Sequence, residues 1–463
     1  MGVGLLLLAW MGAVPGSQAQ QAPSIADADT TEVTFDEAVR IALTQNTDVK
    51  RSQANARSSN AEAQSEWMDF APDLSLNTSM SRRFGRNFSQ VTGDFTTRST
   101  DFFNLGSQSS ITLFNGFENV ASLRESRDRA RASELDLDRT RREVVFTVMD
   151  QFILLVESRE QVRVRREQLE ALEQQLEQTE EFVDAGASPV SDLYQQQADV
   201  AEAEQQLLQA QREREVSQTR LIQTLQLNPR QVYDFQVPEL EERAQTDATY
   251  ELSSLVDEAF ERRLDLKVAS AERRAAEHGV RSARSTYYPS LSIGGNYGTD
   301  WTSRGRIPDP DNPNQFISPD FPDQLRNNRG GGISVSLNIP IFDRLQRNAQ
   351  VEQAQVQEQN AEYALQDQRQ QVALEVRQAY LDYRNAIQQL EAAESRLKAA
   401  EQAQTATQER YNLGSASIVE LRNANRDFVD AASQQVRARY NLLFRKKQIE
   451  YHVGRLDPRQ PLQ

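Results

Sequence analysis

Apolar residues recur at helical spacing along residues 118–183, a stretch that contains no proline. Near its end they lie three, four and seven positions apart, which is the seam of a coiled coil: Val162, Leu169, Leu172, Leu176 and Val183. One unbroken helix of this length would reach about 100 Å at a rise of ~1.5 Å per residue. So long a helix cannot bury its faces alone, and the pattern therefore predicts neighbouring helices.

The helix is predicted to end in a tight turn and to return as a hairpin. Gly186 stands just past the seam, where glycine is common because it tolerates positive φ. Ser188 followed by Pro189 is a good N-cap and first-turn pair for a new helix. We therefore expect a return helix over residues 189–227.

The same hairpin is expected again 228 residues later. A second long helix covers residues 343–413, its turn holds Gly414, Ser415 and Ser417, and its return helix covers 418–454. The segment before the hairpin repeats at a shift of 217, which carries Pro72 onto Pro289. These fixed shifts indicate two repeats, 34–227 and 254–456, joined by a linker at 228–253 and followed by a polar tail at 457–463.

Between the helices of each repeat the apolar period changes to two, the period of a strand. Two strands are predicted in the first repeat, at 74–81 and 105–114, interrupted by a Gly- and Thr-rich stretch at 84–103. Two follow in the second, at 291–297 and 333–341. The apolar sides would face lipid through Leu74, Leu76, Leu291, Ile293, Val335, Leu337 and Ile339.

A helix is predicted before each strand pair, over 34–70 and 255–287. Thr34 and Glu37 form a capping box at the start of the first. Pro72 and Pro289 end the two helices and mark the entries to the strands.

Each predicted strand has about the 9–11 residues that cross a bilayer when tilted, with Ser, Asn and Gly on the other side. Four strands cannot close, and open edges are not tolerated in lipid. The barrel must then be shared, and three copies would supply 3 × 4 = 12 strands. Two ordinary hairpins packed on a soluble core remain an alternative.

The charge balance and composition exclude several classes of protein. The net charge of −16 and the pI near 4.9 argue against nucleic-acid binding. The chain has no cysteine, so a disulfide, a thiolate metal site and a cysteine nucleophile are excluded. His278 and His452 have no metal-spaced companions, so we expect no metal and no cofactor. Gly330 to Gly332 begin a strand rather than a phosphate loop, and no enzyme signal remains.

The first residues have the pattern of a secretory signal. An apolar core at residues 4–10 precedes small residues at Ser17 and Ala19, which predicts a signal peptide over 1–19. The usual basic residues before the core are missing, so the true translation start is open. After this segment no run of about 18 apolar residues follows.

The order helix, strands and hairpin, repeated twice, resembles the TolC family of outer-membrane efflux channels. The Asp-Glu-Ala helix starts at 36–38 and 257–259, the entry prolines and the tip patterns carry the resemblance. It implies an α+β membrane protein: a homotrimer with a shared 12-stranded barrel in the outer-membrane lipid and a 12-helix periplasmic tunnel. It also implies a periplasmic adaptor and an inner-membrane transporter of RND, ABC or MFS type, with docking at Gly186, Ser188, Gly414, Ser415 and Ser417.

The resemblance further implies that Asp192 and Glu420 line the constricted periplasmic end. A carboxylate ring would favour cations, while acids are also common at solvated helix starts. The chain departs from the family's gate pattern at Ala416 and Asn423. The gate latch of this protein must therefore be different.

Two other functions stay open. A secreted coiled-coil structural protein would use the hairpins as rods, but it has no need for the alternation at 291–297 and 333–341. An exporter of proteins cannot be separated from an exporter of small molecules by the sequence.

Overall fold

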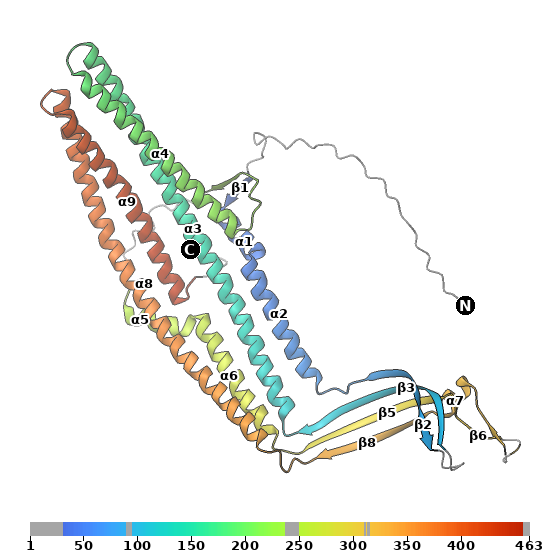
Figure 1. Cartoon of the computed structure of the whole chain (residues 1–463). Coiled ribbons are helices and arrows are strands. Elements are labelled where there is room, and N and C mark those ends of the chain that lie inside the picture. Colours follow the sequence, from blue (N-terminus) through green and yellow to red (C-terminus); the bar gives the residue numbers. More distant parts are fainter. Residues whose placement is uncertain (1–30, 89–94, 237–249, 310–311, 313–314, 457–463) are drawn as a thin grey trace, which may run out of the picture.

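The computed structural model describes residues 31–88, 95–236, 250–309, 312 and 315–456. The predicted signal peptide and polar tail lie outside these residues. The described chain is elongated: a long helical body leads at one end to two hairpin tips and at the other to an arm of strands (Figure 1).

The two long hairpins are confirmed. The first consists of α3 (Glu118–Asp184) and α4 (Val190–Thr224), the second of α8 (Gln346–Asn412) and α9 (Ile418–Val453). Helices α3 and α8 both have 67 residues, which corresponds to about 100 Å. Each long helix lies beside its return helix along the hairpin (Figure 1).

The helices before the strands are not continuous, and our prediction of one helix in each repeat is wrong. The first divides into α1 (Phe35–Gln45) and α2 (Thr47–Met68), the second into α5 (Leu252–Arg262) and α6 (Leu264–Ser285). One residue breaks each helix by adopting an extended backbone, Asn46 at φ −57°, ψ 134° and Arg263 at φ −62°, ψ 126°. One half of the predicted capping box is present, since the Glu37 amide donates to Thr34 Oγ1 at 3.2 Å, while the Glu37 carboxylate accepts from Arg40 at 2.9 Å.

The strands form one antiparallel sheet in the order β2-β3-β5-β8. Their bounds are Ser75–Phe88, Phe95–Asn115, Ser290–Thr302 and Gly330–Asn338. The interruption predicted at 84–103 is wrong, because β2 and β3 stay paired from Ser75–Gln108 out to Phe88–Phe95. The end predicted for the last strand is also wrong, because β8 stops before Pro340, which has no amide hydrogen for the ladder.

Small elements complete the fold. In the middle of the molecule, β1 (Thr31–Thr34) pairs in parallel with β4 (Tyr233–Gln236), which comes from the predicted linker. At the far end of the sheet, β6 (Ile307–Pro308) pairs with β7 (Phe316–Ile317), and α7 (Phe321–Asn327) packs on β5.

The apolar core lies at the middle of the molecule. One cluster joins α1, α3, α4, β1 and β4, and within it the Phe35 and Phe152 rings meet edge to face at 5.1 Å. A second cluster joins α5, α8 and α9 around Val372 and Ile449. This central core joins the middle parts of α3 and α8 to the ends of α4 and α9 and to the starts of α1 and α5.

Candidate functional site

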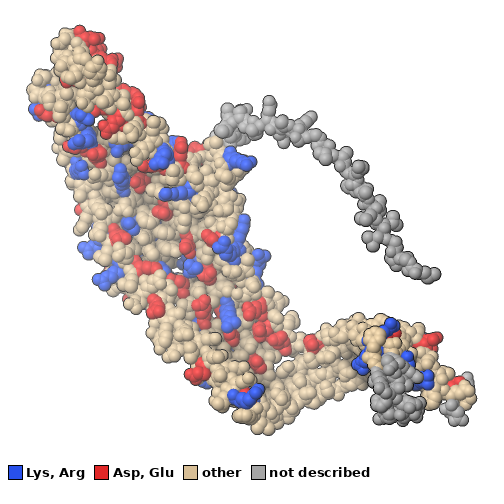
Figure 2. Space-filling view, viewed as in Figure 1, with Lys and Arg blue, Asp and Glu red and all other residues tan. Residues whose placement is uncertain are grey.

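The register of the sheet separates an apolar face from a polar face. Leu291 lies opposite Leu337 and Ile293 opposite Val335 on one face, while Ser292 lies opposite Ser336 on the other. Leu76 and Leu337 expose 74% and 62% of their surface. The middle of the arm shows few charged side chains on the face seen in Figure 2. This two-faced sheet is typical of a strand wall between lipid and water.

Two of the candidate lipid-facing residues lie just beyond the strands. Leu74 precedes β2 and Ile339 follows β8, and both are exposed. Leu291 and Ile293 lie inside β5 and are half-buried between the neighbouring strands.

Both edges of the sheet lack a partner strand in the described residues. Strand β2 pairs only with β3, and β8 pairs only with β5. Exposed backbone hydrogen-bonding groups at a sheet edge readily accept another strand. The sheet of the described residues thus has two open edges, β2 and β8.

Aromatic residues gather where the helices meet the sheet. Exposed rings flank both helix-to-strand connections: Trp67, Phe70, Tyr287 and Tyr288 before the strands, and Phe117 and Phe342 after them. At the far end of the sheet, Trp301 and Phe103 each contact Phe321 of α7, at 5.3 and 5.4 Å between ring centroids. Aromatic girdles at both rims are a feature of strand barrels in membranes.

The hairpin tips close through left-handed glycines. Gly186 has φ +70° and Gly414 has φ +71°, as predicted. The Gly186 amide donates to Val183 O at 2.9 Å, and the Gly414 amide donates to Tyr411 O at 2.9 Å. A Cβ at either glycine would meet no atom within 4 Å, so both tips are open to solvent.

The caps after the two turns differ. Ser417 accepts the Glu420 amide at 3.2 Å and caps α9, whereas α4 has Pro189 as N-cap without a side-chain bond. The prediction that Ser188 caps α4 is wrong, because α4 begins one residue later, at Val190, and Pro189 takes the N-cap position. The Ser188 amide belongs to the preceding turn and donates to Phe182 O at 3.2 Å. Ser415 also belongs to its turn, where its hydroxyl donates to Arg410 O at 3.0 Å.

The two candidate acids have different surroundings. Glu420 forms an ion pair with Arg410 at 3.3 Å, and both side chains are about half exposed. Asp192 lies in the first turn of α4, near enough to Tyr411 to act on it by charge. Burial first, and then the charge of Asp192, raises the pKa of the Tyr411 hydroxyl.

Sequence reasoning missed an ion pair that joins the hairpins near their tips. Arg422 on α9 contacts Asp199 on α4 at 2.9 Å, and Asp199 is buried. Burial raises the pKa of the Asp199 carboxyl, and Arg422 opposes that shift. No motif marks this pair, because its members lie on different hairpins, more than two hundred residues apart in sequence.

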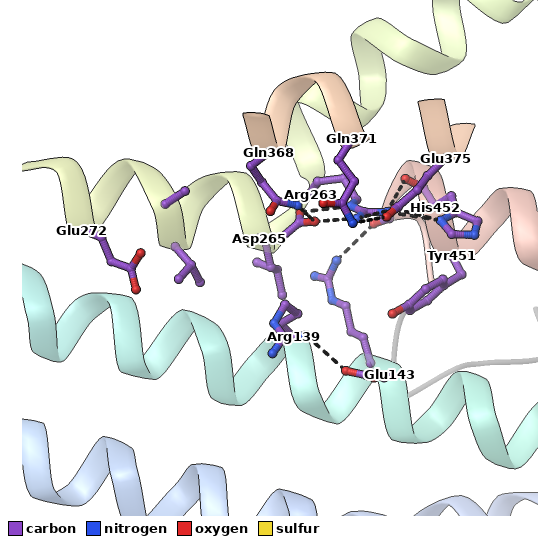
Figure 3. A pocket seen from close by; sticks show the side chains of 15 residues that line it. Arg139, Glu143, Arg263, Asp265, Glu272, Gln368, Gln371, Glu375, Tyr451 and His452 are labelled. Carbon is purple, nitrogen blue, oxygen red and sulfur yellow. Dashed lines mark hydrogen bonds and ion pairs between the residues drawn. The ribbon is translucent and has the colours of Figure 1, made fainter. Parts of the chain in front are cut away.

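A polar cavity of about 470 Å³ at the middle of the body was also missed (Figure 3). Arg263, in the α5–α6 break, donates to Glu375 Oε2 at 2.8 Å and to the His452 carbonyl at 3.3 Å. His452 Nδ1 lies 3.4 Å from Glu375 Oε2. The hydrogen bond from His452, together with Arg263, lowers the pKa of Glu375 to about 2.

These charged groups connect α8 and α9 to the α5–α6 break. Because they pair with one another, we interpret the cavity as a structural connection and not as a ligand site.

Within the described ranges, no group of three or more His, Cys, Asp or Glu residues has the arrangement of a metal site. Nor does any helix of the described chain have the length and apolar composition needed to cross a bilayer.

Comparison with known families identifies the chain. The model of the family "Outer membrane efflux protein" matches residues 38–225 and 255–455, and the chain belongs to this family. The protein is therefore an outer-membrane protein.

Curated relatives match over part of their length. The outer membrane protein TolC of Salmonella enteritidis is 24% identical over 232 residues, which cover 49% of this chain and 45% of that protein. TolC of Escherichia coli (strain K12) is 24% identical over 216 residues, covering 47% and 43%. The aligned part thus spans less than half of either relative.

Solved structures share the fold over almost the whole chain. The CmeC outer membrane channel of Campylobacter jejuni has a TM-score of 0.76 at 19% identity, covering 91% of this chain and 85% of that one. CusC has a TM-score of 0.75 at 18% identity, covering 95% and 99%. VceC of Vibrio cholerae has a TM-score of 0.73 at 16% identity, covering 91% and 96%.

Proposed function

We propose that the protein is a passive export channel of the outer membrane. Three copies join the free edges of their sheets into a barrel of twelve strands, and their helices form a tunnel of twelve helices in the periplasm. The observation that carries this proposal is the two-faced sheet with two unpaired edges. A sheet with unpaired edges cannot stay open in lipid, because each unsatisfied backbone group costs several kcal/mol there.

The proposed assembly has two repeats in each copy, 34–227 and 254–456, with the linker 228–253 around the middle. The tunnel meets a periplasmic adaptor and an inner-membrane transporter of RND, ABC or MFS type and conducts small molecules or proteins. Solvent-open turns at Gly186 and Gly414 support docking at the tips. Asp192 and Glu420 are the proposed constriction acids, and Arg410 neutralises part of the charge of Glu420.

Membrane fractionation and bilayer recording test the channel. The protein is expected in the outer-membrane fraction as a trimer that dissociates on heating, and it should conduct ions in a planar bilayer. Leu337→Arg should prevent insertion, since arginine facing lipid near the midplane costs about 2–4 kcal/mol. Ser336→Arg, one residue away on the polar face, is the matched control and should insert. A soluble monomer, or equal insertion of the two variants, would contradict the proposal.

A further inference from the structure

The strand-to-helix junctions of the two halves have the same unusual backbone. Gly116 and Phe117, before α3, have φ +67° and +69°, and Arg344 and Leu345, before α8, have φ +57° and +65°. The two junctions lie 228 residues apart. Left-handed backbone at a residue other than glycine costs of order 1–3 kcal/mol and persists where its surroundings require it.

Inside the chain, the first junction packs against the connection between α6 and β5. A Cβ at Gly116 would lie 2.5 Å from Ser285 O and 2.7 Å from Tyr288 Cβ. This contact follows from the order of neighbouring strands and helices, because β3 borders β5 and α3 packs on α6. Only glycine fits there.

We infer that the second junction, Arg344 and Leu345, packs against the connection between α2 and β2 of a second copy of this chain. This inference rests on the proposed closure of the sheet between copies, in which β8 would border β2 of the neighbour. Helices α2 and α6 both have 22 residues and lie 217 positions apart. The counterparts of Ser285 and Tyr288 are therefore Met68 and Ala71.

The sizes of the residues indicate that the backbones are farther apart at the proposed contact between copies than at the Gly116 contact within one chain. Arg344 carries the Cβ that position 116 excludes, so the second junction cannot reproduce the first atom for atom. Ala71 lacks the ring that Tyr288 places 3.1 Å from the Cβ position at Gly116. An opening of about 1 Å would admit the Arg344 stem and leave the two Cβ atoms within disulfide range of ~3.5–4.5 Å.

The charges also match across this contact. The end of α2 carries Glu62, Glu66 and Asp69, whose mutual repulsion adds to burial in raising the pKa of Glu66. Their counterparts on α6 are Gly279, Ala283 and Thr286, all uncharged. Arg344 is exposed and has no ion pair within the described residues. Of the two equivalent connections, only the one between α2 and β2, which would face another copy, has acids at these three positions. The junction that would meet it has Arg344, which is unpaired in the described residues.

The same difference appears along the helix that follows. Leu135 and Ile153 of α3 are 8% and 6% exposed, but their counterparts on α8, Tyr363 and Leu381, are 52% and 42% exposed. The face of α8 that is covered in α3 is therefore open in a single chain, as a contact with a neighbouring copy requires.

Cysteine cross-linking tests the contact, since the chain contains no cysteine. Arg344→Cys combined with Ala71→Cys should give disulfide-linked oligomers up to the trimer on denaturing, non-reducing gels. Arg344→Cys combined with Tyr288→Cys is the control and should give no link between copies. Light scattering in detergent measures the trimer independently. A trimer that does not cross-link overturns only this inference, whereas a monomer overturns the proposed function as well.

Charge reversal tests the pairing of Arg344 with the acids. Arg344→Glu should abolish the trimer band that resists detergent at moderate temperature, and adding Glu66→Arg and Asp69→Arg should restore it. Arg326→Glu, at the far end of the sheet, should leave the band unchanged. Loss of the band without rescue by the reversed acids would overturn the ionic match.

Discussion

The breaks at Asn46 and Arg263 both bind a carbonyl at the end of a return helix, one with a neutral side chain and the other with a charged one. Asn46 Nδ2 donates to Thr224 O at 3.0 Å, and Arg263 Nη1 donates to His452 O at 3.3 Å. The breaks lie 217 residues apart and the two carbonyls 228 apart, which are the same shifts that relate matching segments of the sequence. Each break is thus tied to the end of the return helix in its own half.

The two breaks differ in the groups that surround this hydrogen bond. Asn46 is neutral, and its Oδ1 also accepts the Asp48 amide at 2.8 Å to cap α2. Arg263 is charged and needs Asp265 and Glu375, which bond it at 3.0 and 2.8 Å. A buried amide needs only hydrogen bonds, but a buried charge also needs counter-charges. The stability contributed by the second break should therefore respond to charge changes and to pH, and that of the first break should not.

The largest effect is expected from Arg263→Met. This change leaves Asp265 and Glu375 without their cation, and removing one partner of a buried ion pair costs about 3–5 kcal/mol. Urea unfolding in detergent, followed by helical circular dichroism, measures the free energy of unfolding. Arg262→Met is the control, because Arg262 is exposed and its bridge to Glu258 is worth less than about 1 kcal/mol. Equal losses in the two variants would contradict a special role for the second break.

Acidification is expected to have the next largest effect. The pKa of Glu375 is about 2 in the folded protein, below its ordinary value of 4.5. A lowered folded pKa stabilises the fold above the ordinary value, and this contribution disappears as the pH falls from about 4.5 to 2. The loss amounts to at most about 3.5 kcal/mol at ~1.4 kcal/mol per unit.

Unfolding free energies measured across this pH range check the prediction. Glu375→Gln should flatten the profile, while the exposed Glu261→Gln should leave its shape unchanged. A profile that is as steep in Glu375→Gln as in the unchanged protein would contradict the assignment.

A smaller loss is expected from Asn46→Ala. The variant loses the cap of α2 and the bond to Thr224 O, and cap removal typically costs about 1 kcal/mol. The loss should be the same at pH 3 and pH 7, because no charge is involved. Asn46→Asp keeps the cap acceptor but not the donor, so it should separate the two bonds. A loss as large as that of Arg263→Met would remove the distinction between the breaks.

The smallest effect is expected when the second break is made neutral like the first. Arg263→Gln, Asp265→Asn and Glu375→Gln together remove the cation and its counter-charges, so no buried charge stays unpaired. At pH 7 the triple variant should lie within about 1 kcal/mol of the unchanged protein. Its unfolding should also lose the part of the acid dependence that Glu375 contributes. A loss as large as that of Arg263→Met alone would mean that geometry, and not unpaired charge, dominates.

Several features followed from local patterns. The proline-free seam ends within one residue of α3, and Gly186 and Gly414 have the predicted positive φ. Alternation at 291–297 predicted the two faces of β5 that the register confirms. The helix break at Asn46 was not predicted. Asn is a common N-cap residue, and Asp48 in the first turn after it is compatible with a new helix start. Arg263 carries no such signal, because its acceptors on α8 and α9 lie more than a hundred residues away.

The sequence by itself determined the long helices, the hairpin turns and the two-faced strands, and it predicted that these elements recur at fixed shifts. These depend on residues a few positions apart, or on fixed shifts that can be read along the chain. The tertiary structure decided where the helices break, how far β2 and β3 extend, and which charges meet, as in Arg422 with Asp199. Such choices depend on burial and on partners distant in sequence, which set the energy of a charge or a backbone group only once the chain has folded.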